Sequence, residues 1–395
     1  MKSKSKIQMK VFTSSHKVDP VKWEAIRDTE NLFTDLRYLK AVEEANILDC
    51  EHQFFEFSRD GKLLCSIYGF ILINDFASYL NKPWLNIINS IRKAFPDFMK
   101  IKSLEIGTPI NFGLTISLDS QIRDDQLISI ISLIKRYARK QNVNLVLIRD
   151  FRGQTLPIEN HLILSGFSKL ANLPNAILKL RWKSFEEYTA DMKSMYRRNV
   201  KVKKRQKEKA QIQTIICKGK QSLKLVDDYV SLYKNVRKNS DFFSREFYGK
   251  EFHHAMYNNL NEFSYWLQYY KNSKLVAFFH FFVYKGKTVL NILGMDYQVS
   301  FEAMLYFNSY FDWIQYSIDH NIHSYDAGTT TFIAKSSLGF SIVPQRMYLW
   351  MSNPIFLWAV KTGYRHSMDM GIKNVRRAFK EEGYQYLWDG DQDNL

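Results

Sequence analysis

Apolar residues recur along this chain at two different spacings, and each spacing predicts a type of element. Over residues 23–45 they fall three or four positions apart, which is the repeat of a helix with one buried face. Over residues 52–67 two apolar runs flank Arg59, Asp60 and Gly61, the pattern of a β-hairpin closed by a tight turn. The rest of the first half follows the same patterns, with helices predicted over residues 83–94 and 124–141, strands over 103–106 and 144–150, and a loop with a short helix over 157–167.

The pattern starts again after Pro174. Ser184 stands three positions before Glu187, which is the spacing of a capping box that opens a helix, and this helix is expected to continue into residues 192–210. Ser300 is expected to be the N-cap of a later helix. The other elements predicted here are a strand over residues 176–182, helices over 223–238, 246–260 and 301–319, and a three-stranded meander over 264–297.

The restart is an internal repeat. Residues 54–65 and 266–277 both read as strand, turn, Lys-Leu, strand. Each is followed by a strand that ends in glycine, a helix, and a strand that ends in aspartate, at Asp150 and Asp326. The repeat predicts two related α/β domains, each with a mixed central sheet flanked by helices. The expected boundaries are a loose basic leader over residues 1–22, domains over 23–173 and 174–365, and a C-terminal tail over 366–395.

Composition narrows the class of protein. The 395 residues are 46% hydrophobic, which suffices for ordinary cores and excludes a disordered chain. No apolar run approaches the ~18 residues that cross a bilayer, and the N-terminus lacks the apolar segment of a secretory signal. The cysteines, Cys50, Cys65 and Cys217, are few and lack metal-ligand spacing, which favours a reducing compartment. We therefore expect a cytoplasmic protein, with peripheral attachment to the inner membrane face left open.

The net charge of +16 includes a basic stripe in one predicted helix. Lysine and arginine recur there at short steps, at Lys193, Arg197, Arg198, Lys201, Lys204 and Arg205. Like charges at helical spacing oppose the helix that carries them, whereas an ordinary solvated face mixes both signs. The stripe favours contact with a polyanion such as an RNA backbone, anionic lipid or the phosphates of a nucleotide, and a solvated charged face is the alternative.

Several motifs of the second half resemble those of FemAB-like proteins of the GNAT superfamily. Residues 182–188 and 196–204 are similar to the beginning of the second domain in that group, and residues 294–297, 325–328 and 335–339 are similar to its later motifs. The resemblance implies two tandem GNAT-like domains and transfer of an acyl or aminoacyl group to an amine. The implied donor is an acyl-thioester of coenzyme A or a carrier protein or, in the peptidoglycan-bridge branch, an aminoacyl-tRNA.

The candidate catalytic residues are Asp326, Lys335 and His280. By the resemblance, Lys335 would hold a charged donor or acceptor group and Asp326 would lie at the cleft. From the residues themselves, Asp326 stands where a strand ends and can reach a cleft, or it caps the turn at Gly328. Lys335, in a small and apolar run, suits a phosphate or carboxylate, or it is a solvated loop lysine. His280 lies mid-strand among phenylalanines and is either a general base or a structural histidine.

The strand–glycine–helix–strand pattern over residues 288–340 predicts one anion-binding cleft, where a helix N-terminus meets a strand end. The residues expected to bind substrate or donor are Arg197, Arg198, Lys201, Met295, Asp296, Ser300, Tyr306 and Gly328. A Gln/Arg-x-x-Gly-x-Gly loop for a pyrophosphate is missing after Tyr297, which weakens the case for coenzyme A. No metal site is predicted, because His253 and His254 are adjacent and lack the spacing of a metal pair.

Three functions remain open from the sequence. The first is an N-acyltransferase that moves an acyl group from acyl-CoA or an acyl-carrier protein to an amine, with no tightly bound cofactor. The second is an aminoacyl-tRNA-dependent ligase that forms a peptide bond, and the third is a non-catalytic peripheral membrane protein. The expected partners are a small-molecule or peptide amine acceptor, with an acyl-carrier protein, tRNA or an anionic membrane surface as further candidates and no DNA.

Overall fold

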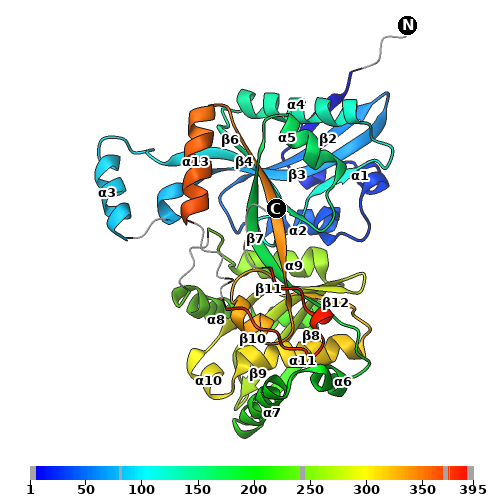
Figure 1. Ribbon diagram of the computed structural model, residues 1–395, viewed down its shortest axis with the longest axis vertical. Helices are drawn as coiled ribbons and strands as arrows, with labels where there is room; N and C mark the ends of the chain where they lie inside the picture. The colour runs from blue at the N-terminus through cyan, green and yellow to red at the C-terminus, as the bar shows by residue number, and fades with distance from the viewer. Residues whose placement is uncertain (1–5, 80–81, 241–244, 368–371, 373, 389–395) are drawn as a thin grey trace.

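The computed structural model describes residues 6–79, 82–240, 245–367, 372 and 374–388. Figure 1 shows two lobes stacked along the long axis of the molecule. The strands of the first lobe are β1 (Gln8–Phe12), β2 (Glu51–Arg59), β3 (Lys62–Asp75), β4 (Lys100–Ile106), β5 (Ile116–Leu118) and β6 (Leu145–Arg152). Those of the second lobe are β8 (Gln213–Lys218), β9 (Ser264–Lys271), β10 (Lys274–Tyr284), β11 (Lys287–Met295) and β12 (Ser324–Asp326). Two further strands, β7 (Ser168–Lys179) and β13 (Ser341–Met351), run side by side between the lobes (Figure 1).

These strands form one mixed sheet of 13 strands, in the order β1-β2-β3-β4-β6-β13-β7-β12-β11-β10-β9-β8, with β5 beside β3. Its two halves are equivalent, since β4 pairs with β6 in parallel and β11 pairs with β12 in parallel. The last strand of each half is exchanged. β7 follows β6 in the chain but pairs with β12, whereas β13 follows β12 but pairs with β6. The predicted α/β fold with a mixed sheet is therefore confirmed, while the predicted domain boundary at residue 173 falls inside β7 and stays a prediction.

Helices cover both faces of the first lobe. On one face α4 (Asp124–Lys140) and α5 (Pro157–Leu164) bury apolar side chains such as Ile130 and Leu162 against β4 and β6. On the other face α13 (Pro354–Ser367) packs Leu357 and Val360 against β6, β7 and β13. The remaining helices of this lobe are α1 (Pro20–Ile26), α2 (Leu36–Glu44) and α3 (Lys82–Arg92).

The second lobe is also covered on both faces. The helices α6 (Phe185–Asp191), α7 (Ser194–Lys209), α10 (Tyr297–Glu302), α11 (Leu305–Asp319) and α12 (Phe332–Ser336) belong to one core. On the opposite face α8 (Val226–Lys238) and α9 (Lys250–Leu260) meet α2 in a core that the two lobes share. Gly294 in β11 allows α8 to pack closely on this strand, because a Cβ there would lie 2.6 Å from the backbone nitrogen of Tyr233 in α8.

Local capping residues correct two predictions in the first lobe. The helix expected over residues 23–45 is two helices, because Asp35 accepts a hydrogen bond from Arg37 N (2.9 Å) and begins α2 anew. The expected loose leader contains β1, which pairs with β2 through residues such as Met9 opposite Phe57. The predicted hairpin is confirmed as β2 and β3.

Three helix predictions in the second lobe also change. Ser184 caps α6 as expected, with Glu187 N donating to its hydroxyl (3.1 Å), but α6 ends at Asp191 and α7 is a separate helix. The helix expected over residues 301–319 is likewise broken, because Met304 takes a positive φ of 51°. Ser300 therefore lies inside α10, and the N-cap of α10 is Asp296.

Within the described residues, no helix is long and apolar enough to cross a membrane.

Candidate active site

The loop between β12 and α12 has an unusual backbone. Gly328, Thr330 and Thr331 all adopt positive φ angles, of 69°, 70° and 48°. A β-branched residue in this region clashes with its own backbone, so two successive threonines there store conformational strain. The loop is held against β7, where Ala176 N donates to Gly328 O (3.0 Å). Strain that is fixed in this way often marks a functional site.

Asp326 ends β12 and is 6% exposed. Its carboxylate accepts hydrogen bonds from Arg152 Nη1 (2.6 Å), Asn175 Nδ2 (2.8 Å) and Gly328 N (2.9 Å). Arg152 belongs to β6 of the first lobe and its side chain is 29% exposed. Donors from three different elements thus fix the carboxylate and compensate its charge.

Lys335 lies in the last turn of α12 and points back to the strained loop. Its Nζ donates to Thr329 O (2.8 Å) and Gly328 O (3.4 Å), and the residue is 3% exposed. Burial lowers the pKa of the Lys335 amine to about 7, although the nearby charge of Asp326 opposes this shift. The amine is therefore available in its neutral form near pH 7.

Tyr306, on α11, also contacts this loop. Its hydroxyl lies 2.7 Å from Thr331 Oγ1 and 3.1 Å from the Tyr310 hydroxyl. Of the residues predicted to form a site, the structure thus gathers Asp326, Gly328, Lys335 and Tyr306 around one loop. The roles assigned to them stay predictions.

The structure places His280 elsewhere. It lies in the core shared by the lobes, with its ring 4.4 Å from that of Trp266 and its Nδ1 2.9 Å from Asn291 Nδ2. Burial holds the pKa of His280 well below its usual value, so the imidazole is neutral. Among the described contacts, none joins His280 to Asp326 or Lys335. Its role as a general base stays a prediction, and its burial in an aromatic core fits the alternative of a structural histidine.

The helix after β11, where the sequence predicts an anion site, already has a carboxylate at its N-terminus, and the binding roles of Met295, Asp296 and Ser300 stay predictions. Asp296 accepts from Gln298 N (3.0 Å) and Val299 N (3.5 Å), so its carboxylate already occupies the end of α10. Ser300 and Met295 are buried. A phosphate at this point would meet a negative charge instead of unpaired N–H groups.

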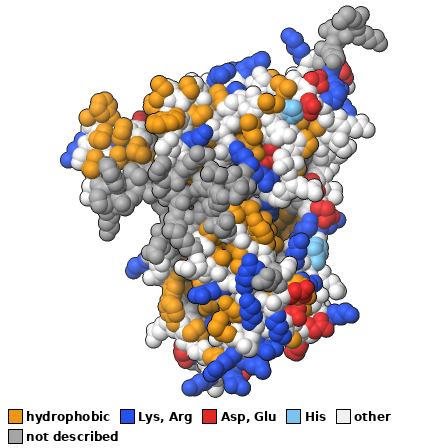
Figure 2. Space-filling model, viewed as in Figure 1, with side chains coloured by type: hydrophobic (Ala, Val, Ile, Leu, Met, Phe, Trp, Pro, Cys, Tyr) orange, Lys and Arg blue, Asp and Glu red, His pale blue; other side chains and the backbone are white. Residues whose placement is uncertain are grey.

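The basic stripe lies on α7, at the far end of the second lobe (Figure 2). Arg198, Lys201 and Arg205 are exposed, whereas Arg197 is half-buried and donates to Ala190 O (3.5 Å). Lysines on the inner side of α7 pack over aromatic rings instead, with Lys203 4.4 Å from the ring of Phe307.

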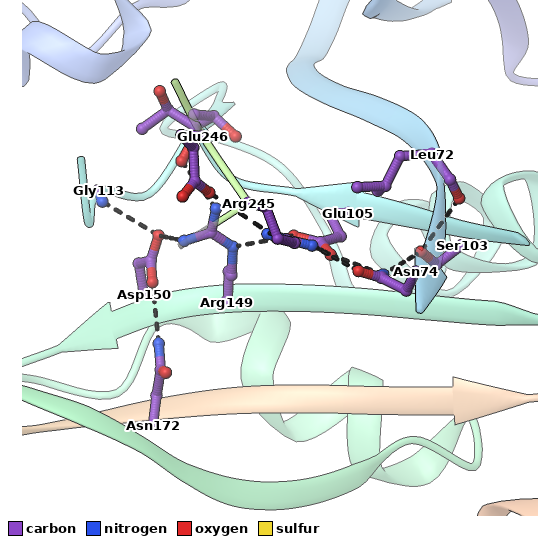
Figure 3. A network of polar contacts seen from close by, with 12 residues as sticks. Leu72, Asn74, Ser103, Glu105, Gly113, Arg149, Asp150, Asn172, Arg245 and Glu246 are labelled. Atoms are coloured by element: carbon purple, nitrogen blue, oxygen red, sulfur yellow. Dashed lines mark hydrogen bonds and ion pairs between the residues drawn. The ribbon is translucent and has the colours of Figure 1, made fainter. Parts of the chain in front are cut away.

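Asp150, the repeat partner of Asp326, has a matching set of donors. Its carboxylate accepts from Arg149 Nη1 (3.0 Å), Asn172 Nδ2 (2.9 Å) and Gly113 N (3.1 Å). Each aspartate therefore has one arginine from β6, one asparagine from β7 and one glycine N–H. Figure 3 shows that the Asp150 group continues into a larger network.

Arg245, from the second half of the chain, completes that network. Glu105 on β4 accepts from Arg245 Nη1 (2.7 Å) and Asn74 Nδ2 (3.0 Å), and lies 3.5 Å from Arg149 Nε (Figure 3). Burial alone would raise the pKa of Glu105, but Arg245 and Arg149 outweigh it and hold this pKa at about 2. No lysine takes part among the described contacts of Asp150.

Two β-bulges explain how these donors reach the two aspartates. The register between β13 and β7 shifts between Val343 and Gln345, and that between β13 and β6 shifts between Arg346 and Tyr348. Each shift inserts one residue, so side chains three positions apart, such as Asn172 and Asn175, share a face. Gln345 confirms this, because it lies opposite Asn172 in register and donates to Asn175 Oδ1. Sequence reasoning missed Arg152, Asn175 and Gln345, and the only local signal was Pro174 within the bulge.

Two equivalent half-sheets joined edge to edge define an α/β protein with an internally repeated mixed sheet. A family model described as FemAB-like, peptidoglycan biosynthesis/recognition, matches residues 14–384. The chain belongs to this family. The resemblance predicted from the motifs is thereby confirmed, and it supports transfer of an acyl or aminoacyl group as the class of reaction.

Solved structures share the fold at low sequence identity. FemX superposes with a TM-score of 0.54 and 9% identity, over 89% of this chain and 100% of that one. The C-terminal (DUF2156) domain of a protein from Agrobacterium fabrum named a lysylphosphatidylglycerol synthetase gives a TM-score of 0.53 and 9% identity, over 89% and 97%. At this identity the likeness shows the fold alone. No curated protein sequence matches the chain.

Proposed function

We propose that the protein transfers an aminoacyl group from an aminoacyl-tRNA to an amine, and that Lys335 accepts the proton which the amine releases. The observation that carries this proposal is the environment of Lys335, a buried lysine with a pKa of about 7 that donates to two backbone carbonyls at a strained loop. A general base works best when its pKa lies near the working pH.

The proposed step balances without a cofactor. The acceptor nitrogen attacks the carbonyl carbon of the donor ester, a C–N bond forms, and the C–O bond to the ribose oxygen breaks. Lys335 Nζ takes the proton from nitrogen and returns one to the leaving oxygen. Asp326 is not the proton acceptor in this scheme, because Arg152, Asn175 and Gly328 already occupy its carboxylate. Its proposed role is to hold negative charge near the protonated lysine.

Two observations favour a tRNA donor over a coenzyme A thioester. Asp296 caps α10 and puts a carboxylate where a pyrophosphate would need N–H groups. The exposed stripe of Arg198, Lys201 and Arg205 offers positive charge to a nucleic acid backbone, which binds through just such side chains. The family's description adds a peptidoglycan precursor as a candidate source of the acceptor amine. A thioester donor remains the second candidate, since the lysine chemistry suits either leaving group.

The test offers the full-length protein an amine panel that includes peptidoglycan precursor peptides, with aminoacyl-tRNA, acyl-CoA or acyl-carrier protein as donor. Mass spectrometry of the products identifies the group that was transferred. We expect an amide product with aminoacyl-tRNA only. Turnover with thioesters alone would replace the proposed donor, and no product from any donor would contradict the proposed reaction.

A charge-reversal variant tests the donor separately. Arg198→Glu/Lys201→Glu/Arg205→Glu should weaken tRNA binding by about tenfold or more and flatten its salt dependence. The matched control, Arg136→Glu/Arg139→Glu/Lys140→Glu, makes the same charge change on exposed positions of α4. Equal loss in the two variants would assign tRNA binding to overall charge and contradict a role for α7.

A further inference from the structure

Large apolar side chains are exposed on two elements of the first lobe. Figure 2 shows hydrophobic side chains gathered over α3 and over α13 on one face of the molecule. The α3–α13 surface consists of Ile87, Phe95, Phe98, Ile355, Phe356 and Trp358, which are between 41% and 72% exposed. Phe76, which precedes α3 in the chain, belongs to the same apolar cluster as Leu357 of α13. Large apolar side chains that are exposed together on one face mark an interaction site.

The projecting part of this surface is held in a fixed shape. Arg92, at the end of α3, donates to both carboxylate oxygens of Asp75 (2.9 and 2.6 Å) and to Phe98 O (2.9 Å). Phe98 N in turn donates to Phe95 O (3.0 Å). A bidentate ion pair therefore fixes the turn that displays the two phenylalanine rings. Rings that are displayed by an ordered turn lose little conformational freedom on binding.

The surrounding charge is positive overall. Among the described side chains, Arg92 pairs with Asp75 and Lys100 pairs with Asp97, which leaves the charges of Lys93 and Lys361 in excess. Aromatic side chains next to lysine and arginine are the pattern by which proteins enter the interface of an anionic bilayer. Each basic residue near such a surface adds attraction that salt screens.

We infer that the α3–α13 surface binds the surface of an anionic lipid bilayer. Phe95, Phe98, Phe356 and Trp358 enter the headgroup region, and the basic residues around them contact lipid phosphates. A second copy of the chain fits less well, because two such surfaces would bring like charges together. Figure 1 shows α3 projecting from the lobe, a shape that suits insertion into a soft surface.

This assignment separates lipid contact from the basic stripe on α7, which lies at the opposite end of the molecule (Figure 1). The two surfaces can therefore be tested independently. The inference does not depend on the proposed reaction, because none of its residues belongs to the group around Lys335.

The experiment measures flotation of the full-length protein with phosphatidylcholine vesicles that contain about one third phosphatidylglycerol. We expect binding that falls as salt is raised and that is weak on vesicles of phosphatidylcholine alone. Phe356→Ser/Trp358→Ser and Phe95→Ser/Phe98→Ser should each reduce the bound fraction by about tenfold. The matched control is Leu164→Ser/Phe301→Ser, which removes two side chains that are 79% and 68% exposed elsewhere on the molecule.

Circular dichroism and thermal unfolding of each variant establish that it is folded. Vesicle binding that survives both aromatic variants, or falls equally in the control, would overturn the inference. So would the absence of binding to any vesicle, and so would concentration-dependent self-association that the same variants abolish, because the surface would then hold a second copy. Lys93→Glu/Lys361→Glu should weaken binding to anionic vesicles and leave the unfolding temperature unchanged.

Discussion

The two buried aspartates of this protein lie in equivalent strands of the two half-sheets but have different neighbours. Asp150 and Asp326 each bind an arginine of β6, an asparagine of β7 and a glycine N–H. Beyond these shared partners, the Asp150 group continues into the ion pairs of Glu105 with Arg149 and Arg245. The Asp326 group instead faces Lys335, whose amine contacts only backbone carbonyls among its described partners.

The difference shows that the same set of donors around an aspartate can serve two purposes. In the first half each charge has an opposite charge beside it, which stabilises a contact between segments that are far apart in the chain. In the second half Arg152 compensates Asp326, and burial lowers the pKa of the Lys335 amine to about 7, so the amine can lose its proton near neutral pH. A network in which every charge has an ion-pair partner resists a change in protonation. A buried amine that contacts only carbonyl groups and has a pKa near 7 can exchange a proton during a reaction.

The largest expected effect follows removal of the amine. Lys335→Met should lower kcat of aminoacyl transfer by about 10³-fold, because the substrate amine then has no group that takes its proton. Lys335→Arg should be nearly as inactive, since a guanidinium does not deprotonate in a protein. Single-turnover assays across pH should show a wild-type rate that rises through pH 7, as the neutral form of Lys335 becomes populated.

The control is Lys135→Met on α4, a half-buried lysine whose pKa is also lowered by burial but which lies in the first lobe. It should retain the wild-type rate and pH profile. A pH profile that is unchanged in Lys335→Arg would contradict the role proposed for the lysine.

The next largest effect concerns stability in the first half. Glu105→Gln should reduce the free energy of unfolding by about 3–5 kcal/mol, because it leaves Arg149 and Arg245 buried without their shared counter-charge. The folded-state pKa of Glu105, about 2, lies below the ordinary 4.5, so its contribution is complete above pH 4.5 and is lost as pH falls toward 2. Chemical denaturation at several pH values measures both effects.

Glu56→Gln on β2 is the matched control. This glutamate is 7% exposed, but Glu56 Oε1 has no hydrogen-bond partner among the described residues, and burial raises the pKa of Glu56. Its replacement should cost little or even stabilise the fold. If both variants lose the same stability, the arginine pairs are not what makes Glu105 important.

Much of the fold could be predicted from the sequence because local patterns determine it. The alternation in residues 52–67 and 264–297 predicts the hairpin and the meander that the structure contains. The repeat of strand, helix and Asp-ended strand correctly predicts two equivalent half-sheets. Asp326 and Lys335 could be proposed together because both lie in short motifs that resemble those of the family, with Asp326 at the end of a strand. Errors arose where a polar side chain caps the backbone, as Asp35 and Asp296 do.

The partners of the two aspartates could not be predicted, because they depend on long-range register. Regular alternation would put Asn172 and Asn175 on opposite faces of β7, and only the bulge between them brings both to one face. Arg152 reaches Asp326 across 174 positions in the chain. The exchange of β7 and β13 between the halves likewise leaves no local trace in the sequence.

A smaller effect is expected on stability, which the loss of Lys335 should increase. Lys335→Met should raise the free energy of unfolding by about 2 kcal/mol at or below pH 7, because the folded protein no longer carries a buried ammonium. The folded-state pKa of about 7 lies below the ordinary 10.5, so the wild type gains stability as pH rises from 7 to 10.5. The advantage of the variant should vanish above that range. A variant that is less stable than the wild type at pH 6 would show that the lysine is a structural residue.

The smallest effect gives the closest comparison between the halves. Asn172→Ala and Asn175→Ala each remove one donor to a buried aspartate, and each should cost about 1.5 kcal/mol of stability. Only Asn175→Ala should also lower kcat, because it loosens Asp326 beside Lys335 while Asn172 serves Asp150. Denaturation and transfer assays on the two variants test whether the groups around Asp150 and Asp326 have separate roles. Equal loss of kcat at equal loss of stability would mean that both aspartates act on the reaction only through the fold.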